Sequence, residues 1–277
     1  MHHAAAYPKI GGTNVTDLPL PCEVRGQLEK PLLAAAIHAG HAVRPELAEL
    51  LAIDGATRLR EEDPFTNHWV QVAPTGVVGT ASRFEVDLNR PRDGAVYRTP
   101  EQSWGLQVWK EPLPEALVAG SLRRYDAFYA EVRRLLDEAE RRFERFVVLD
   151  LHSYNHHRDG PGSEPADPRQ NPDVNVGTGS MDRERWAPVV DRFIAEMAEF
   201  AYPGRRLDVR ENVKFRGGYF PTWIHHGYPK SGCVIAVEMK KFFMDEWTGE
   251  PDPEHIEAIE RALSGAAAGV LEELERM

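Results

Sequence analysis

The feature that most constrains the fold is a set of short apolar runs separated by long amphipathic segments. Residues 31–37, 146–151 and 233–237 are continuous apolar runs with the length of buried strands. Residues 83–88 alternate polar and apolar side chains, which predicts a further strand running into a loop. Strands that are apolar throughout are usually covered on both faces of their sheet.

Helices are predicted between and after these strands. Apolar side chains recur every three or four positions from about residue 114 to residue 143, and further helices are predicted from Asp182 and from Pro253. This alternation indicates an α/β sandwich around a largely buried sheet. The sequence shows no internal repeat and no Gly/Ser linker, so we expect one domain over residues 1–277.

Composition narrows the classes of partner. The chain has 33 Lys and Arg against 44 Asp and Glu, a net charge of −11, which argues against nucleic acid or an anionic membrane as partner. No apolar run is long enough to span a membrane, and we expect a soluble, cytoplasmic protein that binds a small molecule. Cys22 and Cys233 are too few for a disulfide framework or a Cys-based zinc site. The sequence leaves the oligomeric state open.

Polar side chains stand where the predicted strands end. His38, His152 and Glu238 follow or end apolar runs, and the pair Asn89–Arg90 follows residues 83–88. Ligands of open α/β sheets bind at the carboxyl ends of the strands. The sequence therefore predicts a functional site at this edge of the sheet.

Two histidines in such positions favour a metal site. A catalytic zinc ion typically takes three protein ligands and leaves one position for water. His38 and His152 supply two nitrogen ligands, and the spacing leaves the third open among His41, Glu62 and Asp63.

Glu238 is the most informative acidic residue, because burial of a carboxylate at the end of a strand is costly unless it is paired or functional. One interpretation is a salt bridge to Lys240, Lys241 or an arginine. The other is a general base that takes a proton from water. Arg83 and Arg90 then offer two guanidinium groups, one for a developing oxyanion and one for a substrate carboxylate.

The segment Gly177-Thr178-Gly179-Ser180 is similar to a phosphate cradle, but no P-loop lysine follows it. We interpret it as the start of a helix with Ser180 as its N-cap. A Pro-rich segment, residues 160–175, is predicted to be a long loop over the site.

Taken as an ordered set, four motifs resemble the N-formylglutamate amidohydrolase family, which is similar to the zinc-carboxypeptidase-like hydrolases. The motifs are Asp87-Leu88-Asn89-Arg90-Pro91, Asp150-Leu151-His152-Ser153, Arg210-Glu211-Asn212 with Gly217-Gly218-Tyr219, and Val237-Glu238-Met239 through Met244-Asp245-Glu246.

The resemblance implies a three-layer α/β/α sandwich with a mixed sheet that carries a zinc amidohydrolase. The implied zinc ligands are His38, Asp63 and His152. Glu238 matches the carboxylate that activates water, and Arg83 the residue that polarises the scissile carbonyl.

Further implied roles concern substrate binding. Asn89 and Arg90 match positions that hold a substrate carboxylate, whereas His225 matches a family histidine to which we assign no role. The chain departs from its carboxypeptidase-like relatives at His41, where they carry the glutamate of a His-x-x-Glu pair.

These residues predict zinc-dependent hydrolysis of the amide of an N-acyl amino acid similar to N-formylglutamate. Two alternatives remain. A zinc carboxypeptidase-type enzyme would use the same metal and base on a peptide, and a non-catalytic module would only bind an anionic metabolite.

Overall fold

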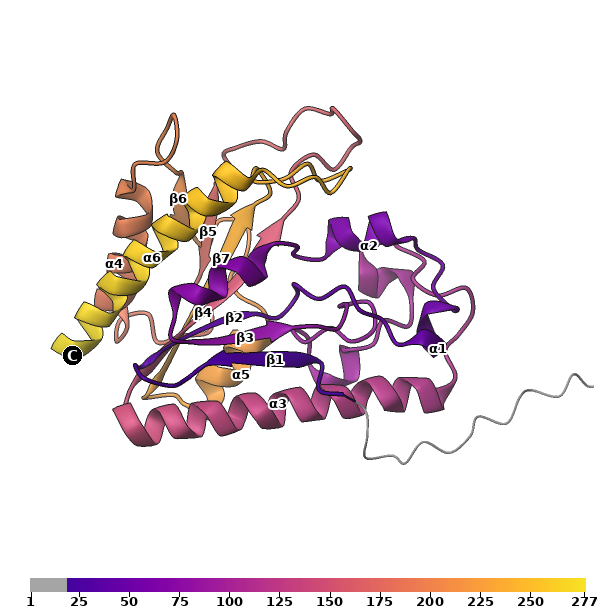
Figure 1. The fold of residues 1–277 in the computed structure, drawn as a ribbon, viewed down its shortest axis with the longest axis horizontal. Coiled ribbons are helices and arrows are strands. Elements are labelled where there is room, and N and C mark those ends of the chain that lie inside the picture. The colour runs from indigo at the N-terminus through magenta and orange to yellow at the C-terminus, as the bar shows by residue number, and fades with distance from the viewer. Residues whose placement is uncertain (1–18) are drawn as a thin grey trace, which may run out of the picture.

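A computed structural model describes residues 19–277 and shows a mixed, seven-stranded sheet in the order β1-β3-β2-β4-β7-β5-β6 (Figure 1). The sheet centre is parallel, whereas β1 is antiparallel to β3 and β5 is antiparallel to β7. The strands are β1 (Cys22–Gly26), β2 (Leu32–Ala36), β3 (Thr75–Gly79), β4 (Phe146–Tyr154), β5 (Val174–Gly177), β6 (Val209–Glu211) and β7 (Gly232–Lys240).

Helices cover both faces of the sheet and make the fold a three-layer α/β/α sandwich, as predicted (Figure 1). Helices α4 (Ala187–Glu199) and α6 (Pro253–Arg276) pack on one face, and α3 (Glu115–Phe143) and α5 (Tyr219–Gly227) on the other. The shorter helices are α1 (Pro45–Ala48), α2 (Gly55–Glu61), η1 (Thr66–Val72), η2 (Arg92–Gly94) and η3 (Pro100–Ser103). Residues 19–277 contain no helix with the length and apolar content needed to cross a bilayer.

The continuous apolar runs are explained by these two covered faces. Because side chains alternate along a strand, Leu149 of β4 and Ile235 of β7 enter the core under α4 and α6. Their neighbours Val148 and Val234 enter the core under α3 and α5. Each such residue stabilises the fold by roughly 1.5 to 3 kcal/mol through removal from water, so neither set can be polar.

The strand predicted over residues 83–88 is wrong. These residues form a buried, irregular segment, because their polar side chains are also buried and satisfied by ionic contacts rather than by solvent. Glu85 pairs with Arg44 and Arg124, and Asp87 pairs with Arg83. Here the alternation reflects a buried ion-pair network and not a half-exposed strand.

Two further sequence expectations need correction. The sheet also contains β1, β3, β5 and β6, which the apolar pattern did not predict; in β3, Gly76 and Gly79 interrupt the pattern, and β5 takes in residues 174 and 175 of the predicted loop. The helix expected from Asp182 begins at Ala187 as α4, and Trp186 occupies its N-cap position without a side-chain hydrogen bond. Because Ser180 lies several residues before this start, it is not the N-cap of the helix.

Register places the polar strand ends together. His152 of β4 lies beside Glu238 of β7, and Glu238 lies beside Asn175 of β5. His38 comes two residues after the end of β2, which is the other neighbour of β4. One edge of the sheet therefore carries the candidate site.

Candidate active site

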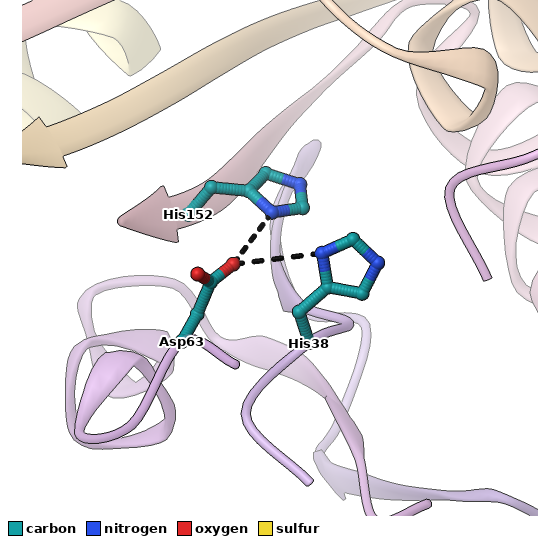
Figure 2. Close-up of side chains that lie close together, drawn as sticks. All are labelled: His38, Asp63 and His152. Carbon is teal, nitrogen blue, oxygen red and sulfur yellow. Dashed lines mark hydrogen bonds and ion pairs between the residues drawn. The ribbon is translucent and has the colours of Figure 1, made fainter. Parts of the chain in front are cut away.

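Three predicted metal ligands converge at this edge. His38, Asp63 and His152 are buried, and each offers a ligand atom that lies within 4.8 Å of the other two (Figure 2). Oδ2 of Asp63 lies 2.9 Å from Nδ1 of His152 and 3.5 Å from Nδ1 of His38. The two imidazoles and the carboxylate therefore point toward a common region.

Asp63 is placed by the end of α2. Asp54 caps the start of this helix by accepting a hydrogen bond from the Thr57 backbone, and the extended backbone of Glu62 ends it. The backbone N–H of Asp63 then donates to the carbonyl of His38, at 3.0 Å. The Ser153 hydroxyl donates to Oδ1 of Asp63, which leaves Oδ2 facing the histidines.

A carboxylate contacts the Nε2 atom of each imidazole ring, on the side away from Asp63. Nε2 of His38 lies 2.7 Å from Oδ1 of Asp87, and Nε2 of His152 lies 2.9 Å from Oδ1 of Asp150. Each Nε2 donates to the carboxylate behind it, and Nδ1 of His152 lies within hydrogen-bond distance of Oδ2 of Asp63. Against the effect of burial, the neighbouring Asp150 and Asp63 hold the pKa of His152 well above its usual value. Carboxylate–histidine pairs of this kind orient the histidine ligands of metal sites.

The donor set fits a divalent cation. The two Nδ1 atoms and Oδ2 of Asp63 face one region, and a divalent cation there would take the place of the protons that join them. Two histidines and one carboxylate are also a known ligand set of catalytic zinc. Residues 19–277 thus hold a buried His38–Asp63–His152 cluster that could bind a metal ion.

The other two candidates for the third ligand face elsewhere. Oε2 of Glu62 lies 2.5 Å from Nδ1 of His41, and its other oxygen accepts from Ser82. Neither Glu62 nor His41 lines the pocket at the cluster. Asp63 is the acid that joins the two predicted histidines.

Glu238 lines the same pocket beside His152. Its predicted structural partners are engaged elsewhere: Lys240 pairs with Asp173, and Nζ of Lys241 donates to the carbonyls of Arg60 and Glu62. Burial raises the pKa of Glu238 to about 7, against the opposing effect of His152. A carboxyl group with such a pKa can both accept and release a proton near neutral pH.

Arg83 also lines the pocket, and its guanidinium is held firmly. It donates to Oδ2 of Asp87 at 2.9 Å and lies 4.7 Å from the ring centroid of Trp104. Asp87 therefore contacts both this arginine and His38 through its two oxygens.

The two predicted substrate-binding residues lie differently. Asn89 lines the pocket, and its Oδ1 accepts from the Phe220 backbone at the start of α5. Arg90 is not among the lining residues, and its guanidinium lies 5.0 Å from the ring centroid of Tyr97. Contact of either residue with substrate stays a prediction.

The pocket has a volume of about 350 Å³ and includes basic residues that the sequence analysis did not select. Arg158 comes from the loop after β4, Lys214 and Arg216 from the segment before α5, and Lys241 from the end of β7. Arg158, Lys214 and Arg216 do not stand at the end of an apolar run, so the strand-end rule could not find them. Lys241 directly follows β7, and the sequence analysis considered it only as a salt-bridge partner of Glu238. The Pro-rich part of the β4–β5 loop does not line the pocket; Asn155 and Arg158, which precede it, do.

His225 has a structural place in the fold. Its Nε2 accepts from the backbone N–H of Val234 on β7, and its Nδ1 lies 2.8 Å from the hydroxyl of Ser180. His225 thereby connects α5 to β7, the strand that carries Glu238. His225 itself does not line the pocket.

Comparison with known proteins gives the fold and the family of the chain. Among solved structures, the chain is similar to an N-formylglutamate amidohydrolase from Ralstonia eutropha JMP134, with a TM-score of 0.74, 16% identity, and coverage of 93% of this chain and 99% of that one. It is also similar to a gene product from Agrobacterium tumefaciens, with a TM-score of 0.65, 17% identity, and coverage of 93% and 97%. No curated protein matches the sequence.

At these identities the structural likeness shows the fold alone. The family model described as N-formylglutamate amidohydrolase, however, matches residues 30–244, which include His38, Asp63, His152 and Glu238. Because this match extends over most of the chain, the protein belongs to the N-formylglutamate amidohydrolase family.

Proposed function

We propose that the protein is a zinc-dependent amidohydrolase that cleaves the amide of a small N-acyl amino acid similar to N-formylglutamate. The observation that carries this proposal is the His38–Asp63–His152 cluster with Glu238 beside it in one pocket. The name of the Ralstonia eutropha structure supports the reaction type. The pocket volume of about 350 Å³ suits a small molecule better than a peptide.

The proposed zinc ligands are His38, Asp63 and His152, with Asp87 and Asp150 orienting the two rings. A zinc ion held there supplies Lewis-acid polarisation and lowers the pKa of water to about 7. The protein's cysteines are both free and buried, which fits the reducing cytoplasm in which we propose that it works.

The protein's own side chains complete the reaction. Glu238 accepts a proton from the attacking water and returns it to the leaving nitrogen, and its pKa of about 7 suits both steps. Arg83, held by Asp87, donates hydrogen bonds to the oxyanion that forms on the scissile carbonyl. Loss of a donor of this kind usually raises the barrier by roughly 3 to 4 kcal/mol. Asn89 and Arg90 remain our proposed contacts for a substrate carboxylate.

The variant Glu238→Gln tests the assignment of the base. It should lower kcat at least about 100-fold, because the amide cannot take a proton from water. The measurement is release of formate or acetate from a set of N-acyl amino acids, together with metal analysis of the same samples. The exposed Glu250→Gln is the matched control.

Near-full activity of Glu238→Gln would show that another group is the base. The same set should include short peptides with a free carboxyl terminus. Faster cleavage of the peptides than of the N-acyl amino acids would favour a carboxypeptidase-type enzyme. Stoichiometric ligand binding without turnover of any substrate would favour a binding module.

A further inference from the structure

Three basic side chains of the pocket have no acidic partner. Arg158, Lys214 and Arg216 all line it, and within the described residues 19–277 none of the three forms an ion pair. Burial and, to a smaller extent, the positive charge of Arg158 lower the pKa of Lys214, against the smaller opposing effect of Glu238. Like charges gathered in one pocket raise the energy of the empty site, and an anionic ligand would relieve this repulsion.

The other basic residues of the pocket differ in this respect. Arg83 donates to Asp87, and Lys241 donates to two backbone carbonyls. Lys214 uses one of its three N–H donors, on Oδ1 of Asn171 at 2.5 Å. Within the described chain, the basic side chains of the pocket that neither pair with an acid nor donate to the backbone are Arg158, Lys214 and Arg216, which we call the basic group.

Hydrogen bonds hold the loop that carries Lys214 against β5, at the residue that lies beside Glu238 in the sheet. The side chain of Asn175, fully buried on β5, accepts from the backbone N–H groups of Lys214 and Phe215 and donates to the Phe215 carbonyl. Asn175 is also the register partner of Glu238. The position of Lys214 is thus set relative to the proposed base.

Two glycines let the next residues approach β5. A Cβ at Gly177 would lie 2.6 Å from the backbone N of Gly217, and one at Gly179 would lie 2.8 Å from Cβ of Arg216. The Gly179 N–H donates to the Arg216 carbonyl at 2.7 Å. The loop that carries Arg216 can therefore pack against residues 177–179 only because both positions are glycine. This packing accounts for the two glycines, and no phosphate-binding role is needed.

We propose that the basic group binds a carboxylate on the amino-acid part of the substrate, and that Lys214 and Arg216 are specificity-determining residues. This inference rests on the proposed function, because it concerns the same pocket. This contact is additional to the one proposed for Asn89 and Arg90, and it comes from residues that line the pocket, whereas the Arg90 guanidinium packs on Tyr97 and does not.

The test uses Lys214→Met and Arg216→Met with N-formyl-L-glutamate, N-formyl-L-glutamine and the α-amide of N-formyl-L-glutamate. The wild type should prefer the dicarboxylate. Each variant should raise KM for it roughly tenfold or more with little change in kcat, as expected for loss of a hydrogen bond between charged groups. KM for the amide that lacks the bound carboxylate should stay unchanged, which identifies the carboxylate concerned. Lys230→Met, at an exposed position, is the matched control.

A second readout separates this inference from the proposed function. Calorimetric titration with L-glutamate, L-glutamine and the α-amide of L-glutamate measures binding without turnover, and both basic-group variants should lose the preference for L-glutamate over the amide that lacks the bound carboxylate. If the wild type hydrolyses N-formyl-L-glutamate but the variants keep its KM and its selectivity, the basic group is not the carboxylate site. If the wild type hydrolyses none of the compounds yet binds L-glutamate through Lys214, the carboxylate site stands and the proposed function fails.

Discussion

At the scale of single residues, Asp87 links the proposed metal site to the proposed oxyanion contact. Its Oδ1 accepts from Nε2 of His38 and its Oδ2 from Arg83, and the Tyr97 hydroxyl also donates to it. The sequence analysis named Asp87 only as part of a motif and assigned it no role. A carboxylate that orients a histidine ligand need not stand at any fixed distance from it in the sequence. The role of Asp87 is therefore visible only in the contacts of the folded structure.

Asp87→Asn should weaken metal binding about 10- to 100-fold, because the amide no longer fixes the His38 ring by charge. The affinity is measured by competition with a chromophoric chelator. Asp93→Asn, an exposed change of the same kind, should leave it unaltered. Equal affinities of the Asp87 variant and the wild type would remove Asp87 from the metal site.

At the scale of elements, the apolar runs predicted β2, β4, β7, α3 and α6, and with them the places of His38, His152 and Glu238. The apolar pattern gave a wrong prediction at residues 83–88, where ion-paired polar side chains are buried. It gave no prediction for β3, where glycines stand in place of apolar side chains. The loop before α5 also lay beyond prediction. Its path depends on Asn175 and on two glycines about 40 residues away in the chain.

Gly179→Ala tests the seating of this loop. The added Cβ would meet Cβ and the carbonyl oxygen of Arg216, each at 2.8 Å, so the loop must shift away from β5. We expect a higher KM for N-formyl-L-glutamate and little change in metal affinity. Steady-state kinetics and a chelator competition check this, with Gly265→Ala, which meets no atom within 4 Å, as the control. An unchanged KM would show that the loop adapts without loss of binding.

His225, at the contact of α5 with β7, gives stability a pH dependence. Burial, and to a smaller extent the neighbouring His226, lower the pKa of His225 to about 4 from 6.5. The neutral ring is therefore favoured in the folded state, and its contribution is complete above pH 6.5 and declines as the pH falls toward 4. The loss reaches about 3 kcal/mol at about 1.4 kcal/mol per pKa unit.

His225→Gln removes this titration while glutamine can still accept from Val234 and donate to Ser180. Urea unfolding at several pH values should show a smaller loss of stability between pH 6.5 and pH 4 in this variant than in the wild type. The exposed His68→Gln, which does not act on His225, should retain the wild-type dependence. A His225 variant with the wild-type dependence would assign the acid sensitivity to other groups.

At the scale of the whole molecule, sheet order decides which distant segments meet. The order β2-β4-β7-β5 places His38, His152, Glu238 and Asn175 along one edge, although up to 200 residues separate them. The strand-end rule predicted this edge and left the third ligand open among His41, Glu62 and Asp63, whereas the family resemblance implied Asp63. Spacing alone could not choose Asp63, since the choice depends on how the end of α2 lies against β2 and β4.

Return of zinc to metal-stripped protein, followed by formate release from N-formyl-L-glutamate, tests the central claim most directly. Activity should be absent without metal and rise until about one zinc ion per chain is bound, whereas His152→Ala should stay inactive over this range. Full activity of the stripped protein, or a wild-type zinc response in His152→Ala, would contradict a metal-dependent amidohydrolase built on His38, Asp63 and His152.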